Sequence, residues 1–250
     1  MERVPILVYT HSEYSFLWKA MVPLLKKYAN EFEIHWLYEK TADQNLIQEW
    51  IPSSWIQHTF DESDIWTRRV GKCLLEIDSE YVLFLHEDWL PIDKLSPQIM
   101  SDMVSFMKAV NCGWLCSYCA LVNNTTRHPG VFTGYNNYYF YPEDNHIFQP
   151  AIWNMNIFRE FCFTLHKAKN QNEDTECLQF MGARGCWSVQ NKETMLSLRT
   201  TNSLFFPHMH ALSEGLWNFR KYPTLKAFLE SFGIETNTRG VHTWWELDTQ

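Results

Sequence analysis

Apolar residues follow two different spacings along the first half of the chain. Short apolar runs at 4–9 and 81–85, and the largely apolar run FEIHWLY at 32–38, are typical of buried strands. Between these runs, apolar residues recur every three or four positions over 17–28 and 65–77, which is the spacing of one helix face. Strand and helix therefore alternate, and this order predicts a mostly parallel sheet covered by helices.

The second half of the chain is less regular. Ser96 and Pro97 predict a helix start, because Ser is a favoured N-cap and Pro suits the first turn. The other predicted elements are a strand over 113–122, a long loop or small hairpin over 123–150, helices near 154–168 and 173–181, a strand at 203–206, and a last helix from Pro223 to Gly233. No repeat or low-complexity tract divides the sequence, so we expect one domain over 1–250 with halves at 1–122 and 123–250.

Composition and charge exclude several classes of function. The net charge is −8, and no stripe of Lys and Arg alternates with aromatic residues, so nucleic acid is not an expected ligand. No apolar run approaches the roughly 20 residues that span a bilayer, and MERVPILVYTHSEY lacks a signal-peptide cleavage site. We therefore expect a cytoplasmic protein with no membrane span. Aromatic residues make up 16% of the chain, enough to build a core and leave rings that stack on sugars or bases.

Polar side chains follow three of the predicted strands. These groups are Thr10-His11-Ser12, Tyr38-Glu39 and His86-Glu87-Asp88. Because ligands bind at the carboxyl ends of parallel strands, we expect the three groups to share one rim of the sheet. Glu87 and Asp88 are hard oxygen ligands that suit a Mg²⁺ or Mn²⁺ ion also bound to substrate phosphates. Acids that only cap the next helix are the alternative.

The run WTRRVGKCLLEIDSEYVLFLHEDWLP resembles the donor-binding segment of a family of small GT-A-fold glycosyltransferases, found in bacterial polysaccharide clusters and large DNA viruses. In that family a buried strand ends in an acidic pair, a variant of the DxD motif, which holds a divalent ion on a nucleotide diphosphate. Further likenesses cover ILVYTHSEYSFLWKAMVPLLKKY, FQPAIWNMNIFREF, LSEGLWNF and TRG. This chain has Glu87 where the family usually has Asp, so Asp88 ranks first as a metal ligand and Glu87 second.

The resemblance implies a function and a division of the chain. It implies a GT-A-like, Rossmann-like fold and metal-dependent transfer of a sugar from a nucleotide-diphosphate sugar to a glycan hydroxyl, with inversion. Residues 1–122 would bind the nucleotide sugar and 123–250 would form the acceptor side. Mn²⁺ or Mg²⁺ is the implied cofactor, and a viral protein of this kind would act in the host cytoplasm.

The resemblance also assigns roles to residues. Asp174 and Glu176 are the candidate bases for the acceptor hydroxyl, although acids at a helix start also complement its dipole. His208 and His210 are candidate metal ligands, and we expect only one of them to face the site. Contacts to the nucleotide are expected from Thr10, His11, Tyr14, Tyr38, Glu39, Trp66, Arg69 and Glu87. The candidate acceptor platform combines the Tyr-rich loop 135–145 with Trp153 and Trp217.

Three alternatives stay open. A nucleotidyltransferase shares the sheet and the metal carboxylates, but it should carry a phosphate loop rich in Gly, Arg or Lys, which THSEYS lacks. A non-catalytic sugar-binding module would keep the aromatic residues and have no need of Glu87 and Asp88. CGWLCSYC (112–119) has the spacing of a radical SAM cluster motif, but a strand there would point its Cys to opposite faces. The seven Cys are expected to be free thiols.

Overall fold

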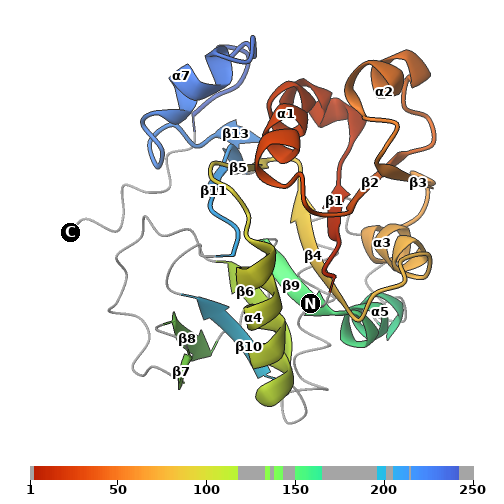
Figure 1. The fold of residues 1–250 in the computed structure, drawn as a ribbon. Helices are drawn as coiled ribbons and strands as arrows, with labels where there is room; N and C mark the ends of the chain where they lie inside the picture. The colour runs from red at the N-terminus through yellow and green to blue at the C-terminus, as the bar shows by residue number, and fades with distance from the viewer. Residues whose placement is uncertain are drawn as a thin grey trace.

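The structure, a computed structural model, places helices on both faces of a central sheet (Figure 1). It describes residues 3–117, 133–135, 138–142, 150–164, 196–200, 205–213 and 215–241. The helices are the 3-10 helix η1 (Ser12–Leu17), α1 (Trp18–Tyr28), α2 (Gln44–Trp50), α3 (Trp66–Leu74), α4 (Pro97–Ala109), α5 (Met155–Thr164) and α7 (Leu225–Glu230). The strands are β1 (Ile6–Tyr9), β2 (Ile34–Glu39), β3 (Ile56–Phe60), β4 (Tyr81–His86), β5 (Trp89–Pro91), β6 (Cys112–Ser117), β7 (Thr133–Tyr135), β8 (Tyr138–Pro142), β9 (Ala151–Asn154), β10 (Leu196–Thr200), β11 (His208–His210), β12 (Leu212–Ser213) and β13 (Leu216–Trp217).

The central sheet has nine strands in the order β3-β2-β1-β4-β9-β6-β10-β8-β7. Strands β3, β2, β1 and β4 run parallel, and β9 enters antiparallel between β4 and β6. Beyond β9, β6 and β10 are parallel, and the β7–β8 hairpin closes the edge. The predicted class is therefore confirmed: an α/β fold with a Rossmann-like, mostly parallel sheet flanked by helices.

Alternate residues of each central strand enter two different cores. Ile6, Val8 and Leu83 pack on the face covered by α1 and α4, whereas Leu7 and Val82 pack on the face covered by α3 and α5. Figure 1 shows α3 and α5 side by side on that second face. Because both faces are covered, β1 and the buried part of β4 are apolar, and polar side chains follow at their carboxyl ends.

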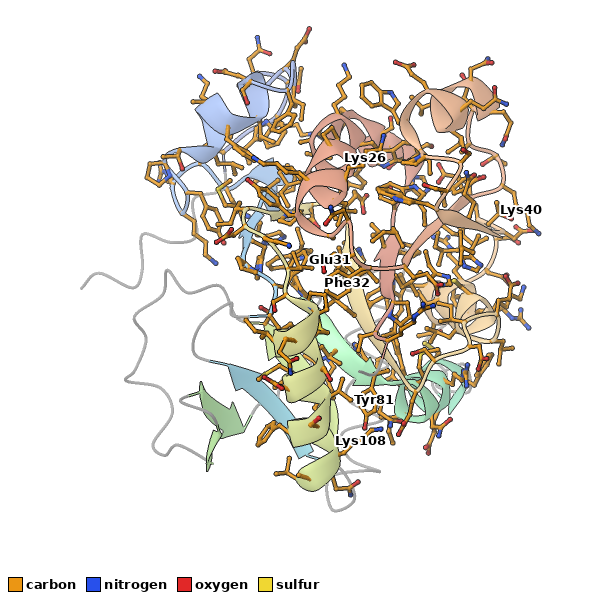
Figure 2. The ribbon with its side chains drawn as sticks, in the orientation of Figure 1. Lys26, Glu31, Phe32, Lys40, Tyr81 and Lys108 are labelled. Carbon is orange, nitrogen blue, oxygen red and sulfur yellow. The ribbon has the colours of Figure 1, made fainter. Side chains whose placement is uncertain are left out.

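The amino end of β4 is tied to α4 at the edge of the sheet opposite the rim. Lys108 of α4 places its Nζ 5.4 Å from the Tyr81 ring centroid and 2.7 Å from Glu80 Oε2 (Figure 2). The predicted start of α4 is also confirmed, since Ser96 Oγ accepts a hydrogen bond from the Ile99 N–H at 3.3 Å. These contacts fix the orientation of β4, whose other end carries the acids.

One strand predicted from the sequence is misplaced. Phe205 and Phe206 form a bend, and the strand that follows is β11 at His208–His210. Its strand conformation depends on antiparallel pairing with β5, in which His210 lies opposite Trp89. The sequence analysis also missed α2, β3 and β9, and the helix predicted at 173–181 lies outside the described residues.

The Cys of the radical SAM-like motif do not form a cluster site. Cys112 packs in the core on the α1 and α4 face, and Cys116 packs in the core on the α3 and α5 face. A register shift in the β6–β10 pairing lies beside Cys112. Two thiols on opposite faces of a sheet cannot bind one iron–sulfur cluster. Cys73, Cys112, Cys116 and Cys162 are free thiols, as predicted.

Candidate functional site

The carboxyl ends of β1, β2 and β4 meet at one rim, as the sequence predicted. The His11 N–H donates to Glu87 Oε1 at 3.4 Å, and the Ser12 N–H donates to Glu39 Oε1 at 2.6 Å. The start of η1 therefore bridges the acid that follows β4 and the acid that ends β2. Both carboxylates are buried, although acidic side chains are seldom buried without a partner.

Asp88 lies in the turn between β4 and β5 and meets a histidine from far along the chain. Its Oδ2 is 3.0 Å from His210 Nε2, and its backbone oxygen accepts the Ala211 N–H at 2.7 Å. The His210 ring stacks on Trp89, with ring centroids 3.8 Å apart and an interplanar angle of 3°. The pairing of β5 with β11 thus delivers an imidazole to the strand-end carboxylate.

The donor set around Asp88 fits a divalent cation. Asp88 Oδ1 is buried and has no hydrogen-bond partner among the described residues. A buried carboxylate oxygen without a donor costs free energy unless a cation or a ligand hydrogen meets it. Carboxylate oxygens with one imidazole nitrogen are ligands that suit Mn²⁺. Asp88 and His210 could hold a metal, with Glu87 next to Asp88 in the chain, and a second group of candidate metal ligands, His11, Glu39 and Glu62, lies at the β2 end of the rim.

His208 has a different role from His210. Its side chain is buried, its Nδ1 donates to the Phe206 carbonyl oxygen at 2.6 Å, and its ring stands edge-on to Trp89. Burial lowers the pKa of His208 to about 3, so the ring stays neutral. Of the two histidines, His210 is the one that contacts Asp88, whereas His208 Nε2 is buried without a hydrogen-bond partner among the described residues.

Tyr14 and Arg239 complete the rim above the acids. Arg239 places its guanidinium 5.4 Å from the Tyr14 ring centroid and 4.9 Å from that of Phe16. Its Nη1 donates to the Gly215 carbonyl oxygen at 3.3 Å, which joins the TRG and EGLW segments. Burial raises the pKa of the Tyr14 phenol, and the charge of Glu87 raises it further. The phenol therefore stays protonated and able to donate a hydrogen bond beside the two acids. Arg239 belongs to the TRG likeness, but it is not among the residues predicted from the sequence to bind the donor.

A second acidic group lies at the β2 end of the rim. Glu39 is fully buried, and its Oε2 has no hydrogen-bond partner in the part of the chain that the structure describes. His11 lies between Glu39 and Glu62, with nitrogen–oxygen distances of 3.8 and 3.5 Å. These three residues bring their ligand atoms within 4.8 Å of one another. The carboxylates of this group can accept hydrogen bonds from a ligand. His11 and Glu39 lie at the carboxyl ends of β1 and β2, as predicted from the sequence.

Three residues predicted to contact the nucleotide have their side chains in the core. Thr10 is buried and accepts the Trp18 Nε1 hydrogen at 2.5 Å. Tyr38 is buried, and its hydroxyl donates to Gln57 Oε1 at 3.2 Å. Trp66 is only 1% exposed and packs edge-on against Tyr9 and Phe84. These placements correct the prediction that the three side chains bind the nucleotide.

Arg69 is used inside the protein. Its guanidinium donates to the Tyr9 hydroxyl at 2.9 Å and to the backbone oxygens of Asp64 and Glu62, each at 2.7 Å. It also lies 4.8 Å over the Phe60 ring. Arg69 thereby fixes the loop after β3 to α3, and this corrects its predicted role as a phosphate contact.

Both Trp of the predicted acceptor platform are buried. Trp153 lies in β9 and stacks on Phe158 with centroids 4.4 Å apart, and Trp217 packs against Phe16 and Phe219. Both indoles are buried, so neither presents a face to a sugar. The candidate bases Asp174 and Glu176 lie outside the described residues, as does most of the side-chain structure of the loop 135–145.

Comparison with known proteins gives likenesses of fold only. No protein-family model and no curated protein matches the chain. A solved structure of TarS 1–349 from S. aureus in complex with UDP is 12% identical, with a TM-score of 0.49, over 95% of this chain and 67% of that one. A cytidylyltransferase from Leptospira borgpetersenii is 10% identical, with a TM-score of 0.49, over 97% of this chain and 100% of that one. The glycosyltransferase GlyE from Streptococcus pneumoniae is 9% identical, with a TM-score of 0.45, over 78% of this chain and 45% of that one.

These likenesses include both glycosyltransferases and nucleotidyltransferases. With TM-scores below 0.5 they identify neither a family nor a reaction. Within the described residues, no helix combines the length and apolar character that a membrane crossing requires.

Proposed function

We propose that the protein is a metal-dependent glycosyltransferase that moves a sugar from a nucleotide-diphosphate sugar to a glycan hydroxyl, with inversion. The position of Asp88 and the contacts of its two carboxylate oxygens are the main support for this proposal. Asp88 follows a fully buried strand, one of its oxygens meets His210, and the other is buried without a partner among the described residues. Asp88 and His210, with Glu87 beside them, would hold Mn²⁺ or Mg²⁺. When bound, the ion would offset charge that develops on the leaving nucleotide diphosphate.

The remaining rim residues suit the binding of a nucleotide. Glu39 Oε2 is placed to accept a hydrogen bond from a ribose hydroxyl or a base N–H, since no described residue donates to it. Arg239 lies by the phenol of Tyr14, whose pKa responds to the charges of Glu87 and Asp88. A guanidinium binds phosphate oxygens well, so Arg239 would contact the diphosphate on the side away from Asp88.

Sugar transfer is favoured over nucleotidyl transfer by the segment after β1. Residues Ser12–Leu17 form the 3-10 helix η1, and their sequence SEYSFL contains no Gly, Arg or Lys. A nucleotidyltransferase needs a loop there that surrounds a triphosphate with backbone N–H groups and cations. In this chain the η1 backbone instead donates to Glu39.

The reaction requires a base for the acceptor. The acceptor oxygen attacks the anomeric carbon, the bond from that carbon to the diphosphate oxygen breaks, and the acceptor proton passes to a carboxylate. Asp174 and Glu176 are the candidates from the sequence. We expect Asp174→Ala or Glu176→Ala, assayed separately, to lower turnover by about 10²-fold or more at nearly unchanged donor affinity. If both variants turn over normally, the base lies elsewhere.

Thermal unfolding with candidate ligands tests the proposed function. We expect one nucleotide-diphosphate sugar to raise the unfolding midpoint only when Mn²⁺ or Mg²⁺ is present, because metal and diphosphate bind as a unit. A nucleoside triphosphate that stabilises the protein and releases pyrophosphate would identify a nucleotidyltransferase. Stabilisation by a glycan alone, without metal, would identify a binding module. Either of these results would overturn the proposal.

A further inference from the structure

Two buried histidines face each other between the edge strand β3 and its neighbour β2. His35 Nδ1 is 2.8 Å from His58 Nε2, and the two rings are parallel within 12°. The side chains are almost fully buried, with exposed fractions of 3% and 6%. The outer ring nitrogens face carboxylates: His35 Nε2 is 2.9 Å from Glu33 Oε1, and His58 Nδ1 is 2.8 Å from Glu76 Oε2. The four side chains form one continuous chain of hydrogen bonds.

The number of protons in this chain follows from its geometry. A carboxylate only accepts, so each outer ring nitrogen carries a hydrogen. The inner contact of 2.8 Å needs one more hydrogen, because two lone pairs at that distance repel. Three contacts therefore need three N–H hydrogens, whereas two neutral imidazoles carry two. With both carboxylates ionised, three hydrogen bonds therefore require one additional proton and one positive charge on the pair.

Burial disfavours a positive charge on the pair, whereas the neighbouring carboxylates favour it. Burial lowers the pKa of His35 and outweighs the hydrogen bond to Glu33, and the charge of His58 lowers it further. From β1, the residue paired with His35 is the apolar Leu7. From α3, the buried Cys73 stays a neutral thiol, because burial and the charge of Glu76 raise its pKa. The charged groups that act on the pair are thus Glu33 and Glu76, and both favour the bound proton.

We propose that His35 and His58 form a single-proton latch that holds the edge strand β3 to β2 and releases it when the shared proton is lost. The latch stabilises the folded state while the proton is bound, and this contribution disappears as the pH rises through the step in which the pair releases it. Once the proton is lost, two hydrogens remain for three contacts, so one of the three hydrogen bonds is lost.

The latch lies directly behind the rim. β2 ends at Glu39, and β3 ends at Phe60, two residues after His58. Phe60 stacks on Tyr9 and lies under Arg69, so a shift of β3 would reach the loop that carries Glu62. The proposal concerns a proton site outside the rim and stands whether or not the protein transfers sugars.

Nuclear magnetic resonance of the full chain, with ¹⁵N-labelled histidine, tests the latch. On the acid side of neutrality, because the pKa of His35 is lowered, we expect three N–H hydrogens on the two rings, with the third in an N–H···N bond. As the pH rises this third signal should vanish, and the Lys40 amide, which donates to the Phe60 oxygen at 2.9 Å, should exchange roughly tenfold faster than base catalysis alone explains. Two N–H hydrogens at every pH at which the protein stays folded, or no change in Lys40 exchange, would overturn the latch.

Variants and a metal probe make the test specific. In His58→Gln the amide can still donate to His35 without a charge, so we expect the third ring N–H and the pH dependence of Lys40 exchange to be lost. Glu76→Gln keeps an acceptor and removes a charge, so the shared proton should leave at lower pH. Glu49→Gln, the same change at an exposed position of α2, should leave that step in place. Stoichiometric Zn²⁺ binding that displaces the third N–H would instead identify a metal site and overturn the proposal.

Discussion

Replacing Asp88 with Asn is expected to lower the rate of sugar transfer by about 10²-fold or more, because the variant loses the negative charge that would hold the metal ion on the diphosphate. The fold should persist, since Asn keeps the side-chain shape and an oxygen within reach of His210. Because Asp88 and His210 are partly exposed, we expect the free energy of unfolding to change by less than about 1 kcal/mol. Steady-state kinetics and chemical denaturation of the same preparation measure the two quantities.

Asp93→Asn is the matched control for Asp88→Asn. Asp93 is an exposed acid five positions further along the chain, and its Oδ1 accepts the Lys94 N–H. It should leave both transfer and the metal dependence of donor binding unchanged. Full activity of Asp88→Asn, or an equal loss in both variants, would refute the metal assignment.

Trp66→Ala should destabilise the protein by about 3–5 kcal/mol, the range found when a large buried aromatic side chain is truncated. Trp66 is 1% exposed and lies at the start of α3, where its ring meets Tyr9 and Phe84 across the sheet face. Its removal would leave a cavity beneath the rim. Denaturant unfolding measures the free energy of unfolding. In the conservative variant Trp66→Phe, we expect a loss of stability less than half of that in Trp66→Ala.

Leu75→Ala is the control at the opposite end of the same helix. Leu75 is 63% exposed, so the substitution should change the free energy of unfolding by no more than about 0.5 kcal/mol. The result that would contradict the structure is a stable Trp66→Ala protein with a large loss of donor affinity. That outcome would return Trp66 to the nucleotide site, where the sequence placed it.

The helix and strand predictions succeeded where local periodicity is strong. The apolar run before His86 requires a buried strand, and the acids after it must then lie at the carboxyl edge. The start of α4 followed from Ser96 and Pro97, whose effect on a helix end is local. The failures concern short elements: β9 has four residues, and its place between β4 and β6 depends on pairing with both.

Residue types alone did not separate the site from the core. Tyr38, Trp66 and Arg69 have side chains that bind nucleotides in many proteins, and here they pack or donate inside the fold. His208 and His210 are equivalent in the sequence, yet only one meets Asp88. Arg239 gains its place beside Tyr14 from the contact of two C-terminal segments, which no local pattern encodes.

The sequence by itself determined the α/β class, the direction of the main strands and the rim on which Glu39, Glu87 and Asp88 gather. Those features depend on hydrophobic spacing, which acts over a few residues at a time. The tertiary structure decided which histidine joins Asp88, which aromatic rings are core, and that His35 and His58 lie in contact. Each of these depends on contacts between segments far apart in the chain, and their burial and pairing are set by packing of the whole sheet.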